Sequence, residues 1–178
     1  MKEYGSNGED SIIYWIKSLA LYIGIALLVR FFIFNITLVD GISMNPTLAD
    51  GDRLITEKIS LYFNEPKKGD IVVINAPDNS KDHYIKRLIG LPGDKIDLIE
   101  GKLYINDIVQ EEDYINSSET LPYTYDTSWI VPEGEIFVMG DNRNHSNDSR
   151  TFGTIAMDQV IGISIFRVYP FNRMGKLN

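Results

Sequence analysis

A serine early in the polar part of the chain lies in a setting that could make it a nucleophile. Ser43 belongs to the segment DGISMNPTLADGD, residues 40–52. Gly41 frees the backbone two residues earlier, and Pro46 favours extended geometry before it, so we predict a defined, non-helical loop. A serine attacks a carbonyl carbon only when a base removes its proton. Ser43 is therefore either a nucleophile or a structural loop hydroxyl, and the choice depends on a base.

Two histidines and one lysine are candidates for that base. His83 and His145 are the two histidines of the sequence, and either could form a Ser-His pair. Lys86 lies in the run HYIKRLIG, where a strand would place it on one face with Tyr84 and Leu88. Apolar surroundings disfavour the charged amine, and a pKa roughly 2–3 units below about 10.4 would let it accept a serine proton near pH 8. The alternative is a lysine that extends to solvent at a strand edge.

A third stretch, GDNRNHSNDSRTFG at residues 140–153, is dense in short polar side chains. Such side chains suit a loop that hydrogen-bonds and holds other groups in place. Asp148 and Arg150 could form an ion pair there, and the Ser146 hydroxyl could orient a lysine amine. The alternative interpretation is a solvated surface loop.

An apolar segment precedes these polar stretches. Residues 12–34 number 23, enough to cross about 30 Å of hydrocarbon at about 1.5 Å per residue, and Lys17 and Arg30 could extend toward the headgroups. We predict a short N-terminal segment over 1–11 and a single transmembrane anchor over 12–34. A buried core helix is one alternative. A cleaved signal peptide is another, which the bulky aromatic residues after Val29 disfavour.

The rest of the chain reads as β-structure. After Val39 short apolar runs alternate with turn signals, and no helical period is evident. We predict a mainly β fold, with a coiled antiparallel or barrel-like domain over 35–178 and an excursion or flap over 106–133. The predicted strands are DIVVIN (70–75), HYIKRLIG (83–90), the hairpin KIDLIEGKLYIND (95–107) turning at Glu100-Gly101, GEIFVMGDN (134–142) and VIGISIFRVYPF (160–171).

Charge and composition exclude several classes of function. The net charge is −8, and residues 1–39 carry three basic and three acidic groups, so the acidic excess lies in the predicted β domain. An acidic domain repels a phosphate backbone, which disfavours nucleic-acid binding. The absence of cysteine excludes disulfides, thiolate metal sites and cysteine nucleophiles, and two histidines disfavour a histidine-rich zinc site. No metal or cofactor is predicted.

Four of these stretches together resemble the motifs of type I signal peptidases, the bacterial membrane-bound serine proteases that remove signal peptides from exported proteins. They are SMNPTL (43–48), GDIVV (69–73), YIKRLIGLPGD (84–94) and GDNRNHSNDSR (140–150). Their order also matches, and the resemblance extends from the anchor to YPF at 169–171. It implies a Ser-Lys dyad with Ser43 as nucleophile and Lys86 as general base, and an extracytoplasmic catalytic domain of coiled antiparallel sheets with the N-terminus in the cytoplasm.

The resemblance also implies supporting roles. Ser146 would orient the lysine amine, Asp148 and Arg150 would form a structural ion pair, and Arg87 and Asp141 match motif positions that support the site. Gly41 stands where some members have a serine whose hydroxyl joins the oxyanion hole. The hole would then depend on the Ser43 backbone N–H and a second donor that the sequence does not identify.

The implied substrates are exported preproteins, cleaved through an acyl-enzyme after an Ala-x-Ala-like site, with the lipid bilayer and the secretion translocon as further partners. The substrate would lie extended against 39–41 and 83–85. Small side chains at positions −1 and −3 would fill shallow pockets. The residues expected to contact substrate are Val39, Asp40, Gly41, Met44, Leu48, Tyr84 and Ile85.

Two rival functions remain open at the level of the sequence. A self-cleaving repressor would share the Ser-Lys chemistry, although the anchor and the acidic charge disfavour a role on DNA. An inactive, membrane-tethered β module could bind exported chains without cutting them.

Overall fold

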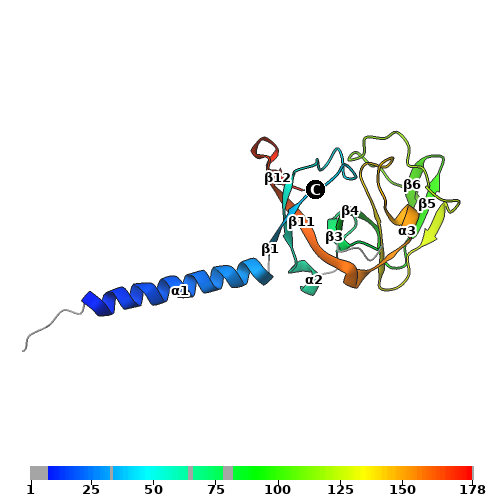
Figure 1. Ribbon diagram of the computed structural model, residues 1–178. Helices are drawn as coiled ribbons and strands as arrows, with labels where there is room; N and C mark the ends of the chain where they lie inside the picture. The colour runs from blue at the N-terminus through cyan, green and yellow to red at the C-terminus, as the bar shows by residue number, and fades with distance from the viewer. Residues whose placement is uncertain (1–7, 33, 64–65, 78–81, 178) are drawn as a thin grey trace, which may run out of the picture.

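The computed structural model describes residues 8–32, 34–63, 66–77 and 82–177. Most of the predicted 1–11 segment therefore lies outside the described residues. Helix α1 (Gly8–Phe32) extends away from a β domain that contains the rest of the described chain (Figure 1). The first strand begins at Phe34, so the last residue of the predicted 12–34 anchor belongs to β1.

Over residues 12–27, the part of α1 whose side chains are described, the large apolar side chains are exposed. Ile12, Trp15, Leu19 and Tyr22 are each more than half exposed, so the alternative of a buried core helix is wrong. Within the described residues, none of the helices combines the length and the hydropathy needed for a membrane span.

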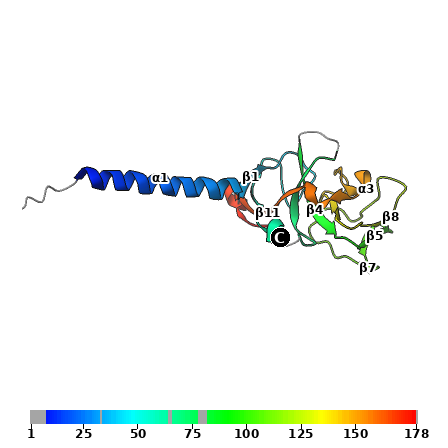
Figure 2. The ribbon, with the colours of Figure 1, turned by 90° about the horizontal axis from the view of Figure 1, so that it is seen from below.

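The β domain is antiparallel, as the sequence predicts, and its described strands form two sheets. The larger sheet has eight strands in the order β1-β2-β11-β3-β4-β9-β10, with β12 paired to β11. Its strands are β1 (Phe34–Leu38), β2 (Arg53–Glu57), β3 (Ile71–Asn75), β4 (His83–Gly90), β9 (Glu135–Met139), β10 (Ile155–Ala156), β11 (Val160–Tyr169) and β12 (Gly175–Lys176). Shifts of register in β4 and β11 mark bulges, which bend strands and increase their twist, and the sheet curls accordingly (Figure 2).

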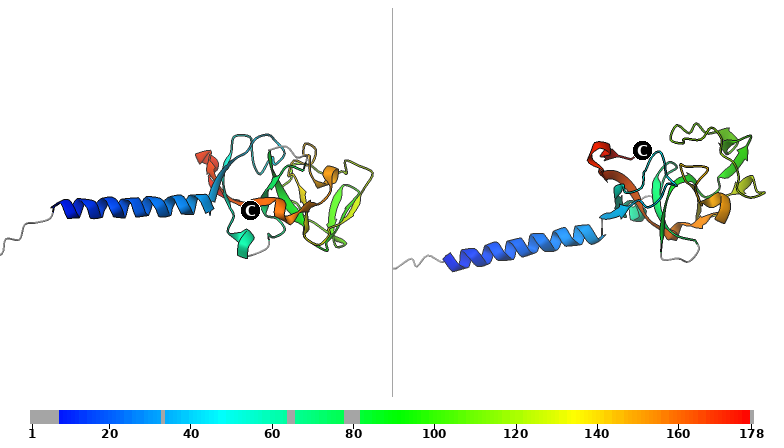
Figure 3. Two further views of the ribbon diagram at one scale, coloured as in Figure 1. Left: turned by 60° about the horizontal axis from the view of Figure 1, so that its bottom comes forward. Right: turned by 45° about the horizontal axis from the view of Figure 1, so that its top comes forward.

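The smaller sheet lies at the end of the domain far from α1 (Figures 1 and 3). Its order is β7-β6-β5-β8, with β5 (Lys95–Ile99), β6 (Lys102–Ile105), β7 (Ile108–Val109) and β8 (Ser128–Ile130). The predicted hairpin is confirmed: β5 and β6 pair, and Glu100 and Gly101 take φ values of 49° and 76° in the turn between them. The 106–133 segment supplies β7 and β8 to this sheet.

Most predicted strands are confirmed, and four single turns of helix are additional. These are α2 (Ser60–Phe63), α3 (Ser149–Phe152) and the 3-10 turns η1 (Met157–Gln159) and η2 (Phe171–Arg173). Each is three or four residues long, too short for a hydrophobic period to appear in the sequence.

Three buried apolar clusters hold the domain together. One packs β3, β4 and β9 against β11, and a second joins the small sheet to β4 and β9. The third consists of Val39, Met44, Leu48, Leu54, Ile71 and Leu177. It fastens the loop between β1 and β2, the loop that carries Ser43, onto the curled sheet.

Candidate active site

The loop that carries Ser43 is anchored by its apolar neighbours and by its own backbone. Met44 and Leu48 are buried on either side of a turn that the hydrogen bond from Leu48 N to Met44 O closes at 2.8 Å. Gly41 N donates to Oδ1 of Asp50 at 2.8 Å, with φ of 95° at Gly41. Ser43 is left partly exposed between these anchors, so its hydroxyl can meet both a base and a substrate.

The structure brings Lys86 to Ser43. Lys86 Nζ donates a hydrogen bond to Ser43 Oγ at 2.8 Å, and only 4% of Lys86 is exposed, so the alternative of a solvated lysine is wrong. Burial lowers the pKa of Lys86 from 10.5 to about 8, against the opposing charges of Asp148 and Asp141. The ring of Tyr84 lies 5.4 Å from the amine, on the face that strand periodicity predicts. An amine with this pKa has a substantial neutral fraction in mildly alkaline solution and can accept a serine proton.

The two histidines are the other candidates for the base, and His83 lines the same pocket as Ser43 and Lys86. Neither has a hydrogen bond to Ser43 among the interactions of the described residues. His145 Nδ1 lies 3.3 Å from Oδ1 of Asn142, and His83 is exposed at the start of β4.

More than half of the polar loop, residues 140–153, is buried, including all of its aspartates and arginines, so the alternative of a solvated loop is wrong. Asp148 and Arg150 form the expected ion pair, with Nε and Nη2 of Arg150 2.9 and 2.8 Å from the two carboxylate oxygens. Oδ2 of Asp148 also accepts from Gly140 N at 3.0 Å. The pair therefore ties the two ends of the loop together.

Arg87 and Asp141 form a second buried ion pair. Nε and Nη2 of Arg87 lie 2.9 and 2.8 Å from the Asp141 oxygens, and Nη1 donates to Gly69 O at 2.8 Å. Asp141, the second residue after β9, is thereby fixed to Arg87 of β4, the residue next to Lys86.

Ser146, which the sequence predicts to orient the Lys86 amine, makes no hydrogen bond through its hydroxyl in the described structure. Its Oγ is buried and has no hydrogen-bond partner in the described structure, so the predicted bond to the Lys86 amine is not formed here. The side chain of Ser146 packs on Gly140, where a β carbon would overlap Ser146 Oγ and lie only 2.5 Å from the carbonyl oxygen of Ser43. Only glycine fits at position 140 without displacing Ser146 or the backbone of Ser43.

Sequence reasoning missed several residues that support the site. Arg143 is fully buried and forms an ion pair with Glu112, whose carboxylate also accepts from Tyr114. Asn142 holds the serine loop, since its backbone N donates to Ser43 O at 3.0 Å and its Nδ2 to Ile42 O at 3.1 Å. Two sequence features could have indicated these residues: an arginine inside the polar loop, and tyrosines in the less patterned 106–133 segment.

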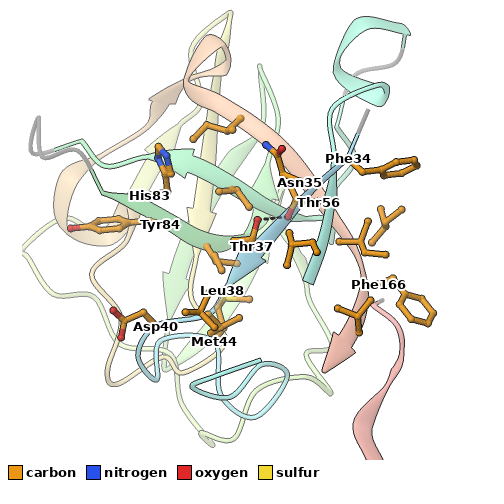
Figure 4. Close-up of a pocket in the computed structure, with 18 of the residues that line it drawn as sticks. Phe34, Asn35, Thr37, Leu38, Asp40, Met44, Thr56, His83, Tyr84 and Phe166 are labelled. Atoms are coloured by element: carbon orange, nitrogen blue, oxygen red, sulfur yellow. Dashed lines mark hydrogen bonds between the residues drawn. The ribbon is translucent and has the colours of Figure 1, made fainter. Parts of the chain in front are cut away.

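Ser43 and Lys86 line a groove of about 1560 Å³ that continues along β1 to Ala26 of α1. Figure 4 shows other residues of its lining, among them Thr37, Met44 and Tyr84. Its walls are mostly apolar, with a hydroxyl pair on one side where Thr37 and Thr56 are hydrogen-bonded at 2.7 Å. The predicted contact residues that line it are Val39, Asp40, Met44, Tyr84 and Ile85.

Two predicted contact residues do not line the groove. Leu48 is 0% exposed because it fills the core beneath the serine loop, and Gly41 is exposed outside the groove.

Over the described ranges, no three carboxylate, imidazole or thiol groups gather as metal ligands would.

Known proteins are similar in sequence to this chain. Residues 12–169 match the family model described as signal peptidase, peptidase S26. Signal peptidase I of Bacillus licheniformis is 42% identical, with 98% of each chain covered, and signal peptidase I S of Bacillus subtilis is 40% identical, with 100% of each chain covered. The crystal structure of a signal peptidase I from Enterococcus faecalis is 38% identical, covers 56% of this chain and 97% of its own, and has a TM-score of 0.49.

Proposed function

The chain belongs to the type I signal peptidase family, and on that premise we propose that it removes signal peptides from exported preproteins with a Ser-Lys dyad. The observation that carries the proposal is the 2.8 Å contact between the Lys86 amine and the Ser43 hydroxyl in an open, largely apolar groove. Ser43 is the nucleophile and Lys86 is the general base.

The reaction has two steps. The neutral Lys86 amine takes the Ser43 proton while Oγ forms a bond to the scissile carbonyl carbon. The C–N bond then breaks, the Lys86 ammonium gives its proton to the departing amine, and an acyl-enzyme ester remains. A water molecule that loses a proton to the same lysine attacks the ester. The C–Oγ bond breaks, the Lys86 ammonium returns its proton to Ser43 Oγ, and the signal peptide leaves with a new carboxyl group. The Ser43 backbone N–H is one donor to the oxyanion.

The substrate lies in the groove as an added strand. β1 is an edge strand, and the pairing of β4 with β9 begins only at Arg87, which leaves the first half of β4 open on that side. A preprotein segment between residues 39–41 and 83–85 would pair with these backbones. Its alternate side chains would face the enzyme, which explains a requirement for small residues at −1 and −3.

Helix α1 is proposed to attach the enzyme to the lipid bilayer. Its exposed apolar side chains would be buried among acyl chains, and Lys17 could extend to the headgroups. The N-terminus would then lie in the cytoplasm and residues 35–178 outside, close to the translocon that delivers the preprotein.

Cleavage of a purified preprotein by the full chain in detergent tests the function. We expect one cut directly after an Ala-x-Ala site, identified from the masses of both products. A matched preprotein with leucine at −1 should stay intact, because a larger side chain does not fit a shallow pocket. An enzyme preparation that binds the first preprotein and leaves it uncut would favour the binding-module function instead.

The pH dependence of kcat/KM should report Lys86. The protonated amine cannot act as a base, so kcat/KM should rise about tenfold per pH unit below the pKa of about 8 and level off above it. Initial rates from pH 6 to 10 at low substrate concentration measure the profile. A midpoint near about 6.5, the ordinary pKa of histidine, would contradict the assignment of the base.

A further inference from the structure

We propose that Glu112 is a positioning residue for the Ser43–Lys86 pair and acts through Arg143 and the backbone of Gly140. The inference rests on the proposed function, since it concerns the same active site. Glu112 lies between β7 and β8, outside the residues that line the groove.

Glu112 fixes the orientation of a buried guanidinium. Its carboxylate oxygens accept from Nη1 and Nη2 of Arg143 at 2.9 and 2.5 Å, and the two side chains are 7% and 0% exposed. The Tyr114 hydroxyl donates to the same carboxylate at 2.8 Å, and burial raises the pKa of Tyr114, so this donor keeps its proton. A two-point contact between planar groups leaves the guanidinium little freedom to rotate.

The fixed guanidinium in turn holds Gly140. Nε of Arg143 donates to Gly140 O at 3.0 Å, while Gly140 N donates to the Asp148 carboxylate at 3.0 Å. Both polar backbone groups of this residue are therefore bound to buried charged side chains.

Gly140 lies directly against the reacting serine. A β carbon there would be 2.5 Å from Ser43 O and would overlap the side chain of Ser146. Asn142 N, two residues along, donates to the same Ser43 carbonyl at 3.0 Å. A displacement of Gly140 must therefore move the backbone of Ser43 relative to Lys86.

Further contacts from the segment that follows Glu112 hold the polar loop in place. Thr120 Oγ1 accepts from Arg143 Nη1 at 2.8 Å, and the Tyr123 hydroxyl donates to Arg143 O at 2.5 Å. Leu121 O accepts from Arg150 Nη1 at 3.0 Å. The connection between β7 and β8 thus holds both buried arginines of the polar loop.

A positioning role can be separated from a direct electrostatic one. The charges that act on the Lys86 pKa are those of Asp148, Asp141 and Arg150, with the Tyr84 ring beside the amine. The Glu112–Arg143 pair is neutral as a whole and is not among them. A change in the Lys86 pKa after removal of the pair would report movement of the site and entry of water.

The test replaces the ion pair with apolar side chains of similar size in Glu112→Leu/Arg143→Met, which leaves no unpaired buried charge. The matched control is Glu111→Leu at the exposed neighbouring position. We expect kcat to fall about 100-fold in the double variant, with KM within about threefold of wild type, because a displaced nucleophile loses rate more than affinity. The control should keep wild-type kcat.

Arg143→Lys is a second variant. Lysine keeps a positive charge for Glu112, but it lacks the planar guanidinium that binds Glu112 and Gly140 O at the same time, so we expect kcat to fall about tenfold.

The Lys86 pKa, followed by NMR of its labelled side chain, gives a second readout that needs no substrate. We expect it to rise by about one pH unit in the double variant, toward the solvated value. A folded double variant, or a folded Arg143→Lys, with wild-type kcat and an unchanged Lys86 pKa overturns the inference. If wild type cuts no preprotein, the proposed function fails while the NMR titration still decides whether Glu112 positions Lys86.

Discussion

Replacement of Lys86 by methionine should lower kcat/KM by at least about 10⁴-fold, the scale of loss seen when a nucleophile or its base is removed from a serine protease. Methionine fills most of the same volume but cannot accept a proton, so the Ser43 hydroxyl 2.8 Å away loses its base. Ser43→Ala should cost a similar factor. Because the two groups act as a unit, Ser43→Ala/Lys86→Met should be no slower than either single variant. Single-turnover cleavage of the Ala-x-Ala preprotein measures all three.

A measurement of stability distinguishes the loss of the base in Lys86→Met from misfolding of the variant. The Lys86 pKa is about 8 in the folded chain against 10.5 as the ordinary value, so the unfolded chain binds the proton more tightly, and below pH 8 the folded chain holds a charged, buried lysine. Lysine therefore costs folding about 3 kcal/mol below pH 8, a cost that disappears between pH 8 and 10.5. Lys86→Met should be at least as stable as wild type in thermal unfolding at pH 7, and the difference should shrink toward pH 10.5.

The histidines supply the control for the base. His145→Ala removes a side chain that lies 3.3 Å from Asn142 and has no bond to Ser43 among the described residues, so we expect most of the activity to remain. Activity that survives Lys86→Met and disappears in His145→Ala would transfer the role of base to the histidine.

Gly140→Ala should lower kcat by about 100-fold or more and destabilise the domain by about 1–3 kcal/mol. The new β carbon would meet Ser146 Oγ and lie 2.5 Å from Ser43 O, so backbone has to shift at the serine itself. Parallel kinetic assays and denaturant titrations measure the two effects.

Gly175→Ala is the matched control for Gly140→Ala. It makes the same substitution in β12 at a position where a β carbon would meet nothing within 4 Å, and it should leave both activity and stability near wild type. A fully active Gly140→Ala would mean that Ser43 tolerates a displaced backbone, which would also weaken the proposed role of Glu112.

Much of the fold could be predicted because its signals are local. The alternation in HYIKRLIG gave the whole of β4 and put Lys86 beside Tyr84, and the apolar pairs around Glu100-Gly101 gave the β5–β6 hairpin. Single helical turns such as α2 and the two-residue strand β7 are too short to show a period of their own in the sequence.

The candidate site, too, could be predicted only in part from the sequence. Residue types and spacing made Ser43, Lys86 and the Asp148–Arg150 pair candidates, and the resemblance of four motifs to type I signal peptidases selected them over the structural alternatives. Only the tertiary structure decided that the amine meets the hydroxyl, that Leu48 belongs to the core, and that Arg143 is paired with Glu112. The physical reason is that a pKa, a buried ion pair and a groove depend on which groups exclude water from one another. Those groups come from strands and loops far apart in the chain, and packing alone brings them together.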